Sequence, residues 1–182
     1  MNQKVIILIT VITFFFGILF FAFYNKWLIV SIPSYKTGVA DQVARMKPEK
    51  KEVSLFYWHN KKWNKETVSL LWSEDLSKNI KYLVNSWLNL LEEEAIMKDR
   101  VRNQTVLLSS SLTQAYLSFD RNLLHKESST HKKLMLIEGL LKTMRENNIE
   151  LQSIYFLVHH EIMQDYHLDF SNSWPIYGFL HS

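Results

Sequence analysis

The sequence predicts an α+β protein in which an N-terminal transmembrane helix precedes one compact domain of order β-β-α-β-β-α-β. Three observations support this fold class: one long uncharged apolar run, two segments with apolar residues at helical spacing, and several short segments rich in β-branched and aromatic residues. Because strands and helices alternate in mixed order, we expect the two helices to pack on one face of a single sheet.

The apolar run covers residues 5–24, VIILITVITFFFGILFFAFY, and a helix of this length spans the roughly 30 Å hydrocarbon core of a bilayer. A cleaved signal peptide is the alternative, but its apolar core would be about 7–15 residues long and followed by small residues, whereas bulky residues follow here. We therefore expect a cytoplasmic N-terminus at 1–4, a signal-anchor at 5–24 that contacts the lipid bilayer, and a juxtamembrane linker at 25–52.

The orientation of this single-pass protein does not follow from charge, because positive residues flank the run on both sides. The very short segment before the run favours a cytoplasmic N-terminus and an extracytoplasmic domain, periplasmic or at the cell surface. An adaptor that faces the cytoplasm is a further possibility.

The predicted domain covers residues 53–176 and leaves a C-terminal tail at 177–182. Its first two strands are EVSLFYWHN, which starts near Val53, and ETVSLLWS at 66–73, close enough in sequence to form a hairpin. From Asp75 the apolar residues recur every three or four positions, which predicts a helix to Glu94 or Ala95.

Two short strands, QTVLLSSS and QAYLSFD, follow this helix with a turn at 109–113. A second helix is predicted to start near Ser128-Ser129-Thr130, which are suitable N-caps, and to stop at Asn147-Asn148. LQSIYFLV at 151–158 is the last predicted strand.

The composition argues against several classes of function. The chain has no cysteine, so the domain cannot depend on disulfides, and its formal net charge of +3 comes without the basic stripe of a nucleic-acid-binding protein. Four scattered glycines form no phosphate loop, and there is no G-x-S-x-G nucleophile motif. These residues therefore indicate no catalytic residue and no cofactor site.

The segment at 165–175, DYHLDFSNSWP, is the densest in chemical groups. As the end of the last strand, it would bury Leu168 and Phe170 and form a structural closing turn with the residues His167, Asp169, Ser171 and Pro175. Asp169 would accept backbone N–H groups of the residues that follow it, and Pro175 would end the strand pairing.

A metal-dependent hydrolase anchored in the membrane is the alternative interpretation of this region. It would use the C-terminal cluster of His160, His167 and Asp169 as metal ligands. The spacing of these residues matches no zinc motif, so we expect no metal site.

Trp58 and Trp63 flank a basic turn, HNKKWNK, which is the best candidate for an interaction surface. Aromatic residues at alternate strand positions are more often part of a core, so the turn is a binding hypothesis with a structural alternative.

Residues 53–175 resemble the GerMN domain, the sporulation and spore-germination domain of bacterial envelope proteins. The resemblance is carried by VSLFYW, by the helix LSKNIKYLVNSWLNLLEEE, by QAYLSFDRNLL and IELQSIYFLVHHE, and by the closing YHLDFSNSWP. The chain departs from the family pattern at AIMKDRVRNQT, which lacks the glycine and proline that the family tends to carry between its first helix and middle strands.

The resemblance implies a single-copy, non-enzymatic binding or assembly module of the bacterial cell envelope, with an envelope protein of unknown identity as partner. It also favours the extracytoplasmic orientation.

Overall fold

The computed structural model describes residues 13–14, 16–17, 21 and 49–178. The chain divides into two compact units, Met1–Arg45 and Met46–Ser182, and the second holds every strand that the structure describes. The predicted segments at 1–4 and most of 5–24 and 25–52 lie outside the described residues, as does most of the tail.

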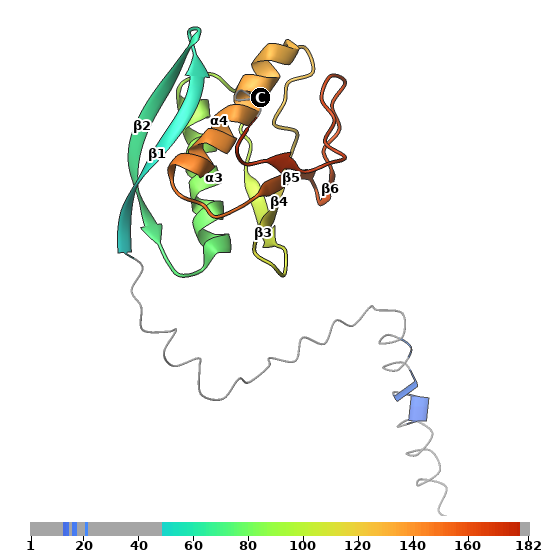
Figure 1. Cartoon of the computed structure of the whole chain (residues 1–182). Coiled ribbons are helices and arrows are strands. Elements are labelled where there is room, and N and C mark those ends of the chain that lie inside the picture. The colour runs from blue at the N-terminus through green and yellow to red at the C-terminus, as the bar shows by residue number, and fades with distance from the viewer. Residues whose placement is uncertain (1–12, 15, 18–20, 22–48, 179–182) are drawn as a thin grey trace, which may run out of the picture. The chain divides into compact units, whose positions relative to one another are not determined.

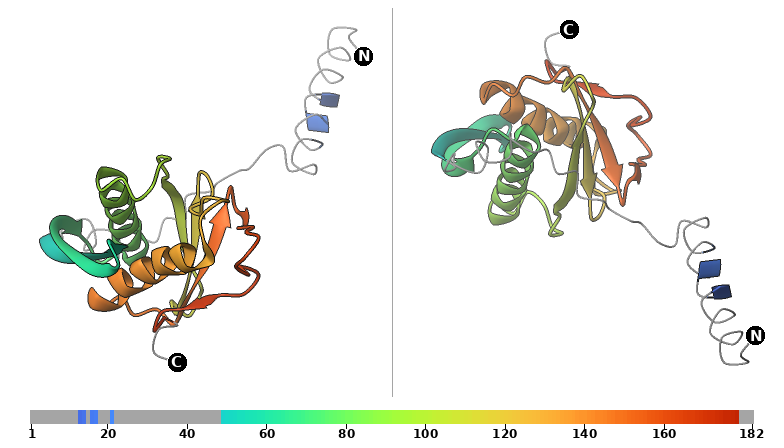
Figure 2. Two further views of the ribbon diagram at one scale, coloured as in Figure 1. Left: turned by 90° about the horizontal axis from the view of Figure 1, so that it is seen from above. Right: turned by 90° about the horizontal axis from the view of Figure 1, so that it is seen from below.

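The second unit is built from three layers (Figure 1). A long hairpin of β1 (Glu49–His59) and β2 (Lys62–Trp72) forms the first layer. The helices α3 (Leu76–Glu93) and α4 (Thr130–Glu146) form the second, and a five-stranded sheet forms the third. Figure 2 shows from above and from below that both helices lie between the hairpin and the sheet.

The five-stranded sheet has the order β3-β4-β5-β6, with β7 paired to β5 beside this path. Its strands are β3 (Asn103–Leu108), β4 (Gln114–Phe119), β5 (Ser153–Val158), β6 (Glu161–Ile162) and β7 (Trp174–Pro175). β4 and β5 are parallel and α4 connects them, because parallel neighbours need a long crossover; the other pairs are antiparallel.

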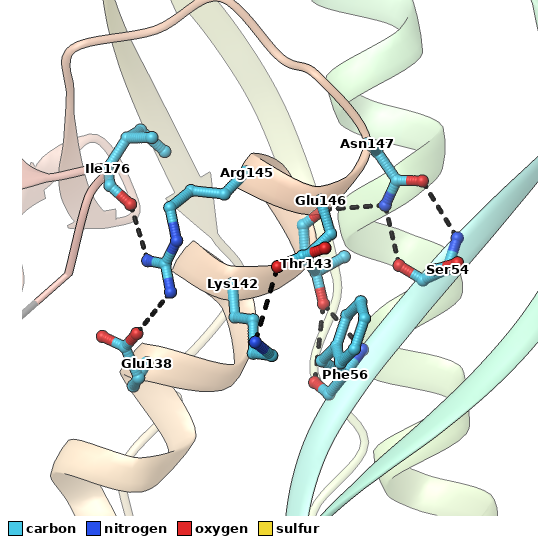
Figure 3. A network of polar contacts seen from close by, with 9 residues as sticks. All are labelled: Ser54, Phe56, Glu138, Lys142, Thr143, Arg145, Glu146, Asn147 and Ile176. Carbon is cyan, nitrogen blue, oxygen red and sulfur yellow. Dashed lines mark hydrogen bonds and ion pairs between the residues drawn. The ribbon is translucent and has the colours of Figure 1, made fainter. Parts of the chain in front are cut away.

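The prediction of a single sheet is therefore wrong. The hairpin is separate from the sheet because of the outer edge of β1, where the backbone groups that point away from β2 bond to helix side chains instead of another strand. The Asn147 side chain accepts from the Ser54 N–H at 2.9 Å and donates to the Ser54 carbonyl at 2.7 Å. One turn earlier on α4, Thr143 Oγ1 accepts from the Phe56 N–H at 2.9 Å (Figure 3). The hairpin cannot continue into a larger sheet at this edge.

The outer edge of β3 is closed in the same way by α3. Side chains at Ser77, Lys81 and Asn85, four residues apart and on one helix face, donate to the carbonyls of Val106, Gln104 and Asn103 at 2.8, 2.7 and 3.2 Å. Each helix thus satisfies the backbone of one strand edge.

The helices begin and end where local chemistry dictates. Asp75 caps α3 by accepting from the Lys78 N–H, and Ser129 caps α4 by accepting from the Lys132 N–H. Burial on its own would raise the pKa of Asp75, but its hydrogen bonds and the charge of Lys78 hold that pKa below the ordinary value.

The core lies between the helices and the sheet. Leu117 and Phe156, neighbours on β4 and β5, are fully buried and face the helices, where Leu83, Trp87 and Leu140 are buried as well. The rings of Tyr116 and Tyr155 stack on the opposite face of the same strands, with their centroids 4.7 Å apart.

The prediction of a transmembrane helix also needs correction. Among the residues that the structure describes, no helix combines the length and the apolar character needed to cross a membrane. The two helices described in full, α3 and α4, both carry charged residues along their length. β1 begins at Glu49, inside the segment predicted as linker.

Candidate functional site

The tip of the β1–β2 hairpin is a tight two-residue turn. His59 pairs with Lys62, and Asn60 and Lys61 between them have φ values of 53° and 62°. This left-handed pair is the geometry of a type I′ turn, whose twist matches that of the flanking strands. The turn fixes the register in which Trp58 lies opposite Trp63.

Trp58 and Trp63 contact each other edge to face, with ring centroids 5.3 Å apart, but they have different surroundings. Trp58 also meets the His131 ring edge to face, at 6.4 Å between the ring centroids. Trp63 packs over Gly139, where an added β-carbon would lie 3.7 Å from the indole and 3.1 Å from the Phe56 carbonyl oxygen. Trp63 therefore helps to seat the hairpin on α4.

A large cleft opens beside the hairpin tip. It has a volume of about 1580 Å³ and is lined by the tip at 57–61, by the loops at 95–99 and 121–129, and by the first half of α4. Trp58 lies in its wall and Trp63 does not. Of the two residues predicted as an interaction surface, the structure places one in a cleft and the other beside it.

The cleft has an apolar floor and a polar rim. The floor is formed by partly or fully buried side chains that include Tyr57, Trp87, Ile96, Met97 and Leu136. Burial raises the pKa of the Tyr57 phenol, and the negative charges of Glu94 and Glu66 raise it further, so the phenol is a neutral hydrogen-bond donor near pH 7.

The first half of α4 also holds the most deeply buried ion pair among the described residues. Lys133 Nζ donates to Asp165 Oδ2 at 2.6 Å, and the two side chains are 0% and 2% exposed. Asp165 Oδ1 accepts from the backbone N–H groups of His167 and Leu168 at 2.9 and 3.1 Å. His167 Nδ1 lies 3.1 Å from the Lys133 ammonium and can accept its hydrogen bond.

The charge on Asp165 is stabilised by these partners. Burial on its own would raise the pKa of this carboxyl, but the hydrogen bond and positive charge of Lys133 and the two backbone N–H groups lower it below the ordinary value. Asp165 therefore works as a structural anion that fixes the segment after β6 to α4.

Arg145 of α4 fixes the end of the same segment. Arg145 Nη2 donates to Glu138 Oε1 and Arg145 Nη1 donates to the Ile176 carbonyl, both at 2.7 Å (Figure 3). Gly178 follows with φ at +79° against the Glu138 carboxylate, where a larger residue would not fit. Residues 165–178 are thus tied to α4 at both ends.

The predicted closing-turn residues are spread along this tied segment. Asp169 Oδ1 accepts from the Ser171 N–H at 2.8 Å, and its hydrogen bonds to Ser171 lower the pKa of the Asp169 carboxyl. His167 belongs to the group around Lys133. Pro175 lies in β7, opposite Ser153 of β5, so it takes part in the strand pairing that it was expected to end. The residues from Met163 to Ser173 form no strand, contrary to expectation.

The metal-ligand set of the hydrolase hypothesis is not assembled. His159 and His160 form the two-residue turn between β5 and β6, with φ values of 51° and 70°, and the His160 N–H donates to Ser118 Oγ at 2.9 Å. Asp169 bonds within its own turn. Within residues 49–178, no group of three His, Cys, Asp or Glu side chains is placed to hold a metal ion.

Several residues of the cleft and of the tied segment carried no sequence signal. Lys133 falls on a helix among other polar residues, and its partner lies 32 positions later in the chain. The loop at 121–129, RNLLHKESS, lines the cleft, although its mixture of apolar, basic and polar residues shows no regular pattern.

Comparison with known proteins yields two solved structures with weak similarity. A protein from Clostridium perfringens that carries the provisional name lipoprotein matches with a TM-score of 0.44 and 14% identity, over 69% of this chain and 87% of its own. The tandem GerMN domains of the sporulation protein GerM from Bacillus subtilis match with a TM-score of 0.43 and 12% identity, over 78% of this chain and 49% of their own. This chain therefore spans about half the length of the GerM domains.

No family model and no curated protein matches the chain. One of the two structural neighbours is built of GerMN domains, the family that the sequence resembles. Both TM-scores lie below 0.5 and both identities below 25%, a range in which structural likeness implies neither shared family nor shared function. Membership of the GerMN family stays a prediction.

Proposed function

We propose that the domain is a non-enzymatic binding module of the extracytoplasmic cell envelope, and that it holds part of a partner protein in the cleft beside the hairpin tip. The observation that carries this proposal is the cleft itself: about 1580 Å³, with apolar lining residues that include Trp58 and Trp87. Open apolar concavities with a polar rim are typical of binding sites.

The chemical groups of the C-terminal region form contacts within the domain, and this favours a binding role over catalysis. Asp165 and Lys133 neutralise each other, Asp169 bonds to Ser171, and His160 is a turn residue. General acid–base chemistry needs a titratable group that faces a substrate. In the described part of the chain, Lys133 and Asp165 fix the C-terminal segment to α4.

An extracytoplasmic location is supported by the sequence alone. The uncharged run at 5–24 is typical of segments that direct a chain to the export machinery. The resemblance to GerMN domains points to the same compartment and to a role in protein assembly.

Site-specific photo-crosslinking in intact cells tests the proposal. A photoreactive residue at Trp58 should give a covalent adduct with one protein, and the same residue at Leu107, which is 58% exposed on β3 and does not line the cleft, should not. A protease that reaches only the extracytoplasmic compartment should digest the domain. Equal adducts from both positions, or protection from the protease, would show that the proposal is wrong.

A further inference from the structure

The charges around the cleft are strongly biased towards positive. Lys61, Lys98, Arg121, Lys126 and Lys132 line it, against two acids, Asp99 and Glu127. The cations therefore outnumber the acids by three, and by two when Arg121 is set against its neighbour Asp120. Lys133 also lines the cleft, but Asp165 neutralises it.

Most of these cations have no competing partner within the domain. Arg121 lies 3.8 Å from the carboxylate of its neighbour Asp120. No ion pair within residues 49–178 involves Lys61, Lys98, Lys126 or Lys132. Exposed cations beside an apolar wall attract an anionic partner, and their field acts over about a Debye length of 8–10 Å.

The cleft is larger than a typical site for one small molecule. Such sites have volumes of about 300–1,000 Å³, whereas this open cleft has a volume of about 1580 Å³. The volume therefore favours an extended polymer segment as the occupant.

The floor indicates which polymer it is. Ile96, Met97 and Leu136 are aliphatic or thioether side chains beside the aromatic rings. Nucleic-acid bases stack on aromatic faces and gain little from aliphatic groups, and an anionic polysaccharide has no apolar side chains to bury.

From charge, size and floor together, we infer that the cleft binds an acidic polypeptide segment that carries apolar side chains. The apolar side chains lie on the floor around Trp58 and Met97, and the carboxylates face Lys61 and Lys132 at the rim. This inference rests on the proposed binding function and names the chemistry of the partner. Met97 suits such a role because its flexible thioether adapts to apolar groups of different shape.

The test is binding by the full-length chain in a neutral detergent, measured by the fluorescence anisotropy of labelled peptides of about ten residues. A peptide of mixed glutamate, leucine and phenylalanine should bind, and binding should weaken as salt is raised. A peptide with lysine in place of glutamate should not bind, and one with serine in place of the apolar residues should bind far more weakly.

Charge-reversal variants locate the site. The double variant Lys61→Glu/Lys132→Glu should weaken binding of the acidic apolar peptide about tenfold or more, because two attractions become repulsions. The matched control Lys50→Glu/Lys65→Glu changes two exposed lysines outside the cleft that form no ion pair within residues 49–178, and it should bind like the wild type. Lys98→Glu/Lys126→Glu gives a second, independent pair on the rim, and circular dichroism checks that each variant folds.

Equal binding of the glutamate and lysine peptides, equal loss in the control, or tighter binding of heparin or a short oligothymidylate would overturn the inference. These outcomes do not touch the crosslinking test: an adduct from Trp58 without peptide binding would reject the acidic apolar segment and leave the binding function standing. Absence of any adduct would instead reject the binding function.

Discussion

The buried pair of Lys133 and Asp165 offers the sharpest test of how the C-terminal segment is held. Asp165→Asn removes the charge of the carboxylate and keeps an oxygen that can accept hydrogen bonds from the His167 and Leu168 N–H groups. These N–H groups lie 2.9 and 3.1 Å from Asp165 Oδ1 in the wild type. The substitution therefore isolates the ion pair. It leaves the Lys133 ammonium, which is 0% exposed, without a counter-charge.

The burial of both partners sets the magnitude. Breaking a buried ion pair by removal of one charge costs about 3–5 kcal/mol, against about 0.2–1 kcal/mol for an exposed pair. A domain of this size is typically stable by about 5–15 kcal/mol, so Asp165→Asn should remove a large part of the free energy of unfolding.

Urea unfolding followed by tryptophan fluorescence measures the loss. Glu146→Gln is the matched control, because it breaks the Lys142–Glu146 pair of 3.5 Å, whose side chains are 26% and 48% exposed. That control should cost about 0.3–0.5 kcal/mol. Lys133→Met combined with Asp165→Asn should recover much of the loss, since no unpaired charge stays buried.

Two results would refute this account of the pair. One is a loss below about 1 kcal/mol in Asp165→Asn, which would mean that water or another group neutralises Lys133. The other is a double variant that is no more stable than Asp165→Asn.

Three further predictions follow from the same contacts. The pKa of Asp165 is lower in the folded than in the unfolded chain, so its stabilisation is present above the unfolded value of about 3.9 and is lost as the pH falls through the folded value. The unfolding free energies of the wild type and Asp165→Asn should therefore become equal only below about pH 4, and equal values between pH 5 and 8 would contradict this. Thr143→Val should destabilise the domain by about 1–3 kcal/mol in urea unfolding because the Phe56 N–H loses its acceptor at 2.9 Å, whereas an unchanged midpoint would show that the edge of β1 is not held there. His160→Gly should raise the melting temperature, because glycine adopts φ near 70° without the roughly 1–2 kcal/mol cost of a β-carbon; a lower melting temperature would mean that the imidazole itself stabilises the turn.

The sequence predicts helices and strands well where one buried face is apolar. Leu83, Val84 and Trp87 recur at helical spacing on α3, and β1 alternates buried Val53 and Leu55 with more exposed neighbours. Such patterns show which face of an element is buried, and they carry no information on what covers the edge of a strand. The separate hairpin could not be predicted for this reason.

The second buried face of α4 explains the rest of the error. Gly139, Thr143 and Asn147 lie four residues apart and are small or polar, so periodicity assigns them to solvent. In the fold they contact the backbone of β1, and the hairpin therefore packs on the far side of the helices from the sheet. The sequence predicts a strand end for the C-terminal segment, because the ion pair that holds this segment needs Lys133, which lies on α4 and 32 positions earlier in the chain.

The polar side chains of α3 and α4 that bond to the edges of β3 and β1 also couple unfolding of the helices to self-association. While the helices are folded, Asn85 and Asn147 occupy the backbone groups at the outer edges of β3 and β1. If either helix frays, a bare strand edge is released, and such edges are templates for pairing with other chains. Aggregation of a partly unfolded population should therefore begin with the loss of helical circular dichroism, while most strand signal persists. In this domain, resistance to aggregation is therefore a property of the helices.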